Sequence, residues 1–165
     1  MVIVRVGIKP KYDDVRGNGR KDYIESKLGI PVGKVSSRQL YTIEGISDED
    51  AKTAAERLLT DKVVEQFEIF HGDVFETRAP EGYRGSWLVR VGYKSKPLVL
   101  DAWGDATRTA LIDLGIKTDS VRHAEEFLIE GELTENQIKT ICKEKLADEK
   151  VQQFSYKPVE VSSVA

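Results

Sequence analysis

Residues 2–8 have a hydrophobic side chain at every second position, which is the period of a β-strand, and residues 87–93 have the same pattern. Both segments contain Val-Arg-Val-Gly, which places Arg5 and Arg90 on the face opposite the valines. We expect these two segments to form strands with one buried face, and the two arginines to face solvent.

A helix is predicted after each of these strands. In the second half, Ala106, Ala110 and Leu114 form an apolar stripe with a spacing of four residues, and Leu111 adds width to it. Gly115 follows the stripe, and Gly29 stands at the matching place in the first half, where a glycine can take the left-handed conformation that ends a helix.

A second helix in each half has a clear start signal. Ser47–Asp50 and Thr134–Gln137 both place a hydroxyl three residues before an acid or an amide, as in a capping box. Each half therefore reads strand, helix, strand, helix, strand, which predicts an α+β fold. Where a helix joins parallel neighbours, the crossover is expected to be right-handed. The remaining strands are predicted at 35–44, 63–70, 121–130 and 151–156.

These matching elements belong to an internal repeat with an offset of about 86 residues. Leu28-Gly29-Ile30, for example, returns as Leu114-Gly115-Ile116, and the matches keep one order along the whole chain. A half of this size buries only a modest core, so we expect the two copies to pack closely as a pseudo-dimer. The predicted organisation is repeat 1 at residues 1–71, a linker at 72–86, repeat 2 at 87–157 and a flexible tail at 158–165.

Composition narrows the class of protein. The formal net charge is −3 and the basic and acidic residues are interleaved, so no basic surplus is available to neutralise nucleic-acid phosphates. No apolar run is long enough for a membrane span, and no signal peptide is recognisable. We therefore expect a soluble cytoplasmic protein. No disulfide framework is expected, because Cys142 is the single cysteine.

No catalytic or metal-binding constellation is recognisable, and no cofactor is expected. His71 and His123 do not occupy matching positions in the two repeats. Cys142 falls on the apolar stripe of a predicted helix, where a small core residue is the favoured interpretation. Residues 16–20, Arg-Gly-Asn-Gly-Arg, are interpreted as a tight loop before a helix, with an anion site as the weaker alternative. Trp103 lies where a loop enters a helix and is either a core residue or a docking anchor.

The second repeat resembles a known family over two stretches. Residues 99–106, Val-Leu-Asp-Ala-Trp-Gly-Asp-Ala, and the later Leu114-Gly115 are similar to a motif of PurS, the small subunit of phosphoribosylformylglycinamidine synthase. Residues 142–148 resemble a second PurS signature, which residues 57–64 match with better spacing in the first repeat. The resemblance covers nearly all of both repeats and leaves out the linker and the tail. Three residues stand where the family has proline: Ala102, Lys62 and Glu149.

The resemblance implies a PurS-like α+β fold for each repeat and a role without an active site of its own. PurS subunits pair as dimers and hold the synthetase PurL against the glutaminase PurQ, and the assembled enzyme uses glutamine and ATP in purine biosynthesis. A tandem chain would then stand in for a PurS dimer, with or without further homodimerisation. The expected partner-binding residues are Asp101, Trp103, Gly104, Arg16, Gly17 and Gly19.

Two other classes of function stay open at this point. The first is a stand-alone regulatory protein that binds a metabolite between the repeats, with Arg5 and Arg90 as candidate ligands. The second is a small enzyme with an anion site at Arg16, Gly17, Gly19 and Arg20. The second is disfavoured because no general base or nucleophile lies in a convincing context.

Overall fold

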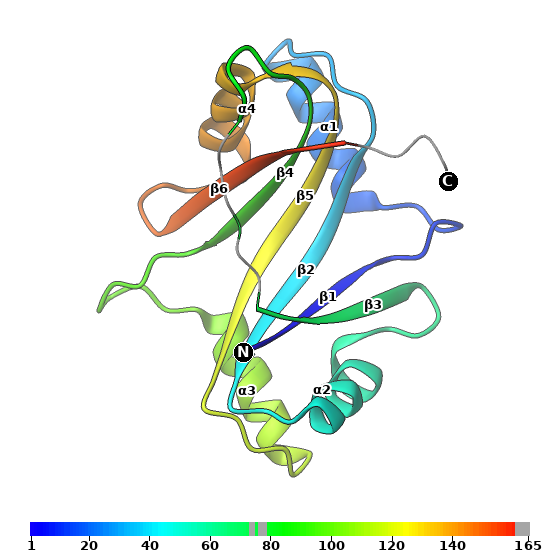
Figure 1. The fold of residues 1–165 in the computed structure, drawn as a ribbon, viewed down its shortest axis with the longest axis vertical. Coiled ribbons are helices and arrows are strands. Elements are labelled where there is room, and N and C mark those ends of the chain that lie inside the picture. The colour runs from blue at the N-terminus through cyan, green and yellow to red at the C-terminus, as the bar shows by residue number, and fades with distance from the viewer. Residues whose placement is uncertain (73–74, 76–78, 161–165) are drawn as a thin grey trace. The chain divides into compact units, whose positions relative to one another are not determined.

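The computed structural model describes residues 1–72, 75 and 79–160, and both repeats contain the same elements in the same order (Figure 1). A π-helical segment extends the second helix of each repeat. The first repeat contains β1 (Val2–Ile8), α1 (Val15–Lys27), β2 (Val35–Glu44), α2 (Asp48–Ala54), η1 (Ala55–Leu59) and β3 (Glu65–His71). The second contains β4 (Arg84–Tyr93), α3 (Ala102–Asp113), β5 (Ser120–Thr134), α4 (Glu135–Ile141), η2 (Cys142–Leu146) and β6 (Gln152–Val159).

The strands hydrogen-bond in the order β3-β1-β2-β5-β4-β6, so the predicted α+β class is confirmed as one six-stranded sheet. The rule for crossovers between parallel neighbours does not apply to these pairs, because β1 pairs antiparallel with both β2 and β3, and β4 pairs antiparallel with β6. Gly7 of β1 lies opposite Arg38 of β2. Helix α1 therefore connects two antiparallel neighbouring strands and is not a crossover between parallel ones.

The compact units of the structure do not follow the two sequence repeats. Unit 1 consists of Met1–Asp13, Arg38–Val74 and Ser95–Glu125, and unit 2 of Asp14–Ser37, Phe75–Lys94 and Glu126–Ala165. Helix α1 of the first repeat thus belongs to unit 2, and helix α3 of the second repeat belongs to unit 1. The long strands β2 and β5 each begin in one unit and end in the other, which is how the chain exchanges its helices.

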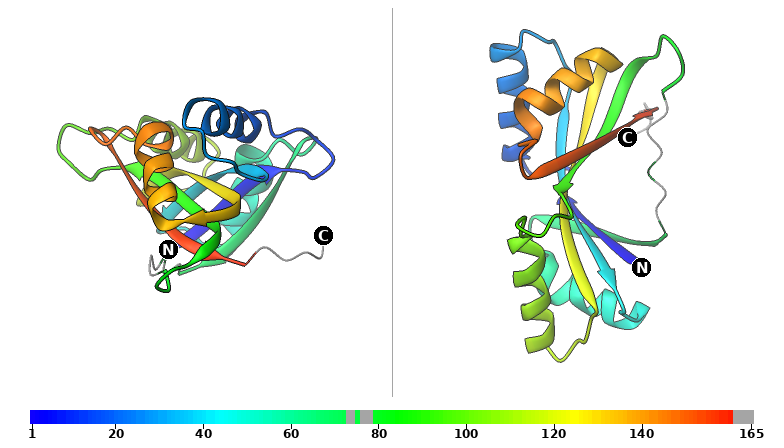
Figure 2. Two further views of the ribbon diagram at one scale, coloured as in Figure 1. Left: turned by 90° about the horizontal axis from the view of Figure 1, so that it is seen from above. Right: turned by 90° about the vertical axis from the view of Figure 1, so that its left-hand side faces the viewer.

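Unit 2 is organised around a fully buried tryptophan. Trp87 donates a hydrogen bond from Nε1 to the carbonyl oxygen of Leu133 at 2.9 Å and meets the rings of Tyr83 and Tyr156 edge-on. Helices α1 and α4 lie on the same face of their strands (Figure 2). The best-buried members of this core come from both helices and from the strands: Ile24, Val89, Phe127, Ile129, Ile138, Ile141 and Cys142.

In unit 1, α3 buries only part of the predicted stripe. Leu111 is fully buried and Thr107 nearly so, whereas Leu114 is half-exposed and Ala106 is exposed. The rotation of α3 is set at its first turn, where Gly104 is packed closely against β5. The core that Leu111 joins also contains Val4, Val6, Tyr41, Ile43, Ala54, Ala55 and Val121.

The predicted helix ends are confirmed. Gly29 and Gly115 follow the C-caps of α1 and α3 with φ of +66° and +83°, and Thr134 forms the complete capping box with Gln137. The strand boundaries differ more. Residues 84–86, which were predicted as linker, form the start of β4. Strand β6 continues to Val159 and so includes the first two residues of the predicted tail. Residues 161–165 of the predicted tail lie outside the described residues.

A turn before the last strand of each repeat has the same hydrogen bonds in both copies. The carboxylate of Asp61 accepts from the amide of Val63, and that of Asp148 accepts from the amide of Lys150. A lysine from the repeated N-terminal strand then donates to a carbonyl of the same turn: Lys9 to Lys62 and Lys94 to Glu149. The two halves of the chain thus share the same hydrogen bonds at this turn.

Candidate functional site

Asp101 ties the start of α3 to strand β5. One carboxylate oxygen, Oδ1, accepts from the amide of Gly104 at 2.8 Å, and the other, Oδ2, accepts from the amide of His123 at 2.7 Å. Gly104 lies so close to β5 that a Cβ atom there would stand 2.5 Å from the carbonyl oxygen of Val121. Asp101 and Gly104 therefore form one structural corner, which needs an acceptor at the N-cap and a glycine three residues later.

The first repeat builds the same corner with Asp14 and Gly17. The carboxylate of Asp14 accepts from the amide of Gly17 at 2.8 Å and from the amide and hydroxyl of Ser37 at 2.6 and 2.7 Å. A Cβ atom on Gly17 would stand 2.2 Å from the carbonyl oxygen of Val35. The equal Asp-x-x-Gly spacing in the two repeats was the sequence signal for this shared corner.

The prediction of a loop at residues 16–20 is wrong, because the segment forms the first turns of α1. Asp14 caps the helix and commits the amide of Gly17, so these residues do not form an open loop. Arg16 and Gly19 are exposed on the helix, and a Cβ atom on Gly19 would meet nothing within 4 Å. Of the six expected partner-binding residues, Asp101, Gly104 and Gly17 are thus engaged in folding contacts, while Arg16, Gly19 and Trp103 present atoms to the surface.

Replacing Asp101 with alanine is expected to lower the free energy of unfolding by about 2 kcal/mol, because the N-cap hydrogen bond and the bond to β5 are both lost. Chemical denaturation followed by circular dichroism measures this change. Asp105→Ala is the matched control, since Asp105 is an exposed acid in the same helical turn, and its effect should stay below about 1 kcal/mol. Equal losses for the two variants would contradict the proposed corner.

Trp103 is partly buried and partly exposed. Its side chain is 43% exposed, and its ring stacks on His123 with centroids 4.0 Å apart and an interplanar angle of 5°. The indole Nε1 donates to the hydroxyl of Tyr41 at 3.2 Å, and His123 Nε2 hydrogen-bonds with Oε1 of Gln39. Trp103 is consequently held in one orientation with part of its ring accessible.

The cluster of Trp103, His123 and Tyr41 is partly buried and lies near an acidic side chain. Burial raises the pKa of Tyr41, the negative charge of Glu65 raises it further, and the hydrogen bond from Trp103 lowers it. The loop before α3 adds two exposed leucines, Leu98 at 96% and Leu100 at 73% exposure. Unit 1 thus presents apolar atoms from Leu98, Leu100 and Trp103 within a short stretch of chain.

The expectation that Arg5 and Arg90 face solvent is wrong. Their side chains are only 17% and 14% exposed. In unit 2, Arg90 Nε donates to Oε2 of the fully buried Glu126 at 2.9 Å, and its guanidinium lies 4.3 Å from the ring centre of Phe75. In unit 1, Arg5 contacts the exposed carboxylate of Glu68 at 3.5 Å. A buried Glu126 could not be predicted from the repeat, because the matching position of the first repeat is Leu40.

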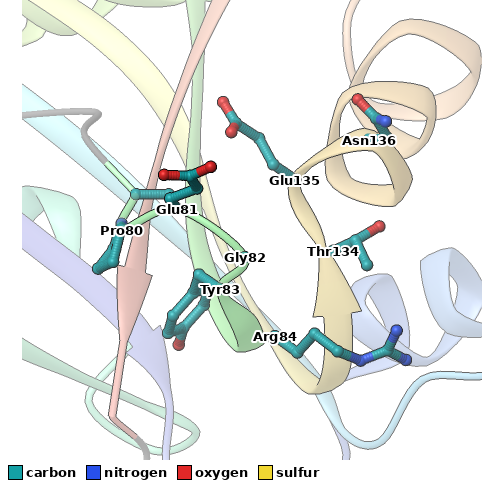
Figure 3. A pocket seen from close by; sticks show the side chains of 9 residues that line it. Pro80, Glu81, Gly82, Tyr83, Arg84, Thr134, Glu135 and Asn136 are labelled. Carbon is teal, nitrogen blue, oxygen red and sulfur yellow. The ribbon is translucent and has the colours of Figure 1, made fainter.

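A pocket of about 500 Å³ lies in unit 2, between the segment that leads into β4 and the start of α4 (Figure 3). Glu81 and Glu135 place two carboxylates at this pocket, and Thr134 and Asn136 add neutral polar groups. The hydroxyl of Tyr83 lies 3.0 and 3.2 Å from the carbonyl oxygens of Ser86 and Val159. Burial raises the pKa of Tyr83, and the charges of Glu160 and Glu132 raise it further.

Tyr156 makes the stability of unit 2 sensitive to alkaline pH. Burial and its hydrogen bond to Glu135, with an O···O distance of 2.9 Å, raise the pKa of Tyr156 to about 12. Because the folded state favours the protonated phenol, its contribution is complete below the ordinary value of 10.0 and disappears as the pH rises towards 12. We expect denaturation at increasing pH to show a smaller alkaline loss for Tyr156→Phe than for the wild type, and equal losses would contradict this assignment.

Two groups with inherent reactivity, Cys142 and His71, differ in their surroundings. Burial raises the pKa of the Cys142 thiol to about 12, so the thiolate is scarce at neutral pH. His71 contacts Asp48 at 2.6 Å on the exposed surface. Among the described residues, no three His, Cys, Asp or Glu side chains are grouped to hold a metal ion. In the same ranges, no helix is long and apolar enough to cross a membrane.

The second repeat also matches a known family. Residues 88–160 match the family model PurS: Phosphoribosylformylglycinamidine (FGAM) synthase. The match begins in β4, ends just after β6 and supports a link between this chain and the FGAM synthase of purine biosynthesis. It includes the Asp101–Gly104 corner and Trp103 of the PurS-like second repeat. No curated protein matches the chain.

Proposed function

We propose that this protein is a non-catalytic bridging subunit of an FGAM synthase complex. In this role it holds a PurL-type synthetase and a PurQ-type glutaminase together, in the cytoplasm. The observation that carries the proposal is the match of residues 88–160 to PurS, over nearly all of the second repeat. The active sites of the reaction would lie in the partner subunits.

The first repeat supports the proposal through its structure, although it lies outside the matched residues. It has the same element order as the PurS-like repeat, including the π-helical end of the second helix. It also repeats the capped corner, with Asp14 and Gly17 in the places of Asp101 and Gly104. These likenesses favour a chain with two PurS-like repeats that replaces a dimer of single-repeat subunits.

Covalent linkage has a physical advantage in such a role. It fixes one copy of each repeat per molecule and raises the effective concentration of one for the other, to about the millimolar range for a short linker. It also releases the two repeats from self-complementarity, because a homodimer must present identical surfaces to both partners. Two different repeats are therefore suited to two different partners.

Reconstitution tests this function. The purified chain is mixed with the synthetase and glutaminase subunits of the same organism, and glutamine-dependent amidine formation is measured with and without it. We expect the three proteins to co-elute on size exclusion and glutamine-dependent activity to require the chain. Ammonia supplied directly serves as the control, because it bypasses glutamine hydrolysis. Full glutamine-dependent activity without the chain, or no co-elution, would overturn the proposal.

A metabolite-binding role is less well supported. Its slight support was that Arg5 and Arg90 occupy matching sites in the two repeats, and each of these side chains contacts a carboxylate of its own unit. We therefore put the bridging role first.

A further inference from the structure

We propose that unit 1 carries, around Trp103, a docking surface for an apolar protein segment on a basic partner surface. The docking surface consists of Leu98, Leu100 and the exposed part of Trp103. The inference deepens the bridging role and rests on it, because the partner would be one of the two catalytic subunits. The first repeat lacks such a surface, so only one subunit is expected to bind here.

The first repeat serves as an internal comparison for this surface. Counted from the shared Asp-x-x-Gly corner, Arg16 stands in the place of Trp103, and Asp13 stands in the place of Leu100. The connection before the corner is also shorter in the first repeat, since four residues separate Lys9 from Asp14. The same local scaffold thus carries charged side chains in one repeat and apolar ones in the other.

This difference argues that the capped corner does not require the apolar residues. Helix α1 has Arg16 at the position of the indole, and it still has its N-cap and the close contact of Gly17 with β2. The corner therefore forms without a tryptophan. Leu98 and Leu100 are among the most exposed apolar side chains of the described structure. Exposed apolar side chains that the corner does not need are typical of an interface.

Trp103 has the geometry of a pre-ordered anchor. Its stack on the buried ring of His123 and its hydrogen bond to Tyr41 fix the side chain before any partner arrives. A tryptophan that is already ordered loses little conformational entropy on binding and offers a large flat area. Tryptophan is for these reasons enriched among the residues that dominate binding energy.

The charge of unit 1 indicates which partner surface fits. The sequence segments of this unit contain fifteen acidic and eleven basic residues, whereas unit 2 contains thirteen and fourteen. Asp105 is exposed on the turn next to Trp103, and the negative charge of Glu65 reaches the Tyr41 hydroxyl that binds the indole. An apolar segment with lysine or arginine around it would complement this surface and associate faster at low salt.

The test uses the full chain with each purified catalytic subunit separately. Trp103→Arg and Leu100→Asp give the surface the residues that the first repeat has at the same places. We expect Trp103→Arg to weaken the binding of one subunit by about 30-fold or more and Leu100→Asp by about 10-fold, with binding of the other subunit unchanged. Because Leu100 is mostly exposed, Leu100→Asp keeps the test valid if Trp103→Arg disturbs the fold.

Val15→Asp is the matched control. Val15 is 79% exposed and apolar, and it lies in the first turn of α1, where an added acid suits the helix N-terminus. This variant should bind both subunits as the wild type does. Fluorescence gives a second readout: Trp87 is fully buried, so acrylamide quenching reports on Trp103 and should fall when the subunit binds.

The outcomes separate the two proposals. If the wild type binds neither subunit, the bridging role and the docking surface both fail. If it binds them but the variants bind equally well and quenching is unchanged, the docking surface fails while the bridging role stands. If the variants change only the self-association of the chain in analytical ultracentrifugation, the occupant is a second copy, which also overturns the proposal.

Discussion

Gly17→Ala is expected to lower the free energy of unfolding by more than about 2 kcal/mol, although alanine is the better helix former. The added methyl group would stand 2.2 Å from the carbonyl oxygen of Val35, and 2.8 Å from a carboxylate oxygen of Asp14. Both neighbours belong to the corner that starts α1, and one is backbone. The helix must therefore move away from β2 or lose its cap.

The control for this variant lies two residues away in the same helix. A Cβ atom on Gly19 meets nothing within 4 Å, so Gly19→Ala should raise the free energy of unfolding by about 0.5–1 kcal/mol through the lower entropy of the unfolded chain. Urea denaturation of both variants gives opposite signs if the corner is built as described. The same sign for both would show that contact with β2 does not control the first turn of α1.

Arg90→Met is expected to destabilise the protein by about 3–5 kcal/mol, because it removes a cation from a carboxylate that has no access to water. The Glu126 side chain is 0% exposed and accepts from Arg90 Nε at 2.9 Å. Methionine fills much of the same volume without a charge, so the loss is mainly electrostatic. Thermal and chemical denaturation both measure it.

Arg5→Met is the comparison, since Arg5 holds the matching position of the first repeat. Its partner Glu68 is 67% exposed and can be hydrated when the arginine is removed, so a loss of about 1 kcal/mol is expected. A further variant, Arg90→Met with Glu126→Gln, should recover part of the stability because the buried charge is then gone. A cost for Arg90→Met no larger than that for Arg5→Met would contradict a special role for the buried pair.

Local signals in the sequence were sufficient for most of the elements. Strand β2 has the predicted bounds, and the glycine ends of α1 and α3 and the capping box at Thr134 occur where they were predicted. These features depend on neighbouring residues along the chain, so a short stretch of sequence contains the information. The predicted stripe of α3 was right for Leu111 and wrong for Ala106 and Leu114, because the rotation of the helix depends on contact between Gly104 and a distant strand.

The candidate site shows the same division. The repeated Asp-x-x-Gly spacing was present in the sequence, but the second bonds of Asp14 and Asp101 go to Ser37 and to the amide of His123, far along the chain. The stack of Trp103 on His123 likewise joins a helix to a strand. Pairs of this kind become visible only when β5 is placed beside α3.

By itself, the sequence determined the α+β class, the order of strands and helices, their caps, and the likeness of the two halves, because each depends on residues close in sequence or on direct comparison of segments. Only the tertiary structure decided which helix packs on which strands. It assigned α1 to the unit of β4 and β6 and α3 to the unit of β1 and β3. The physical reason is that both helices have an apolar side that could cover either set of strands, and the choice depends on where the long strands β2 and β5 carry the chain.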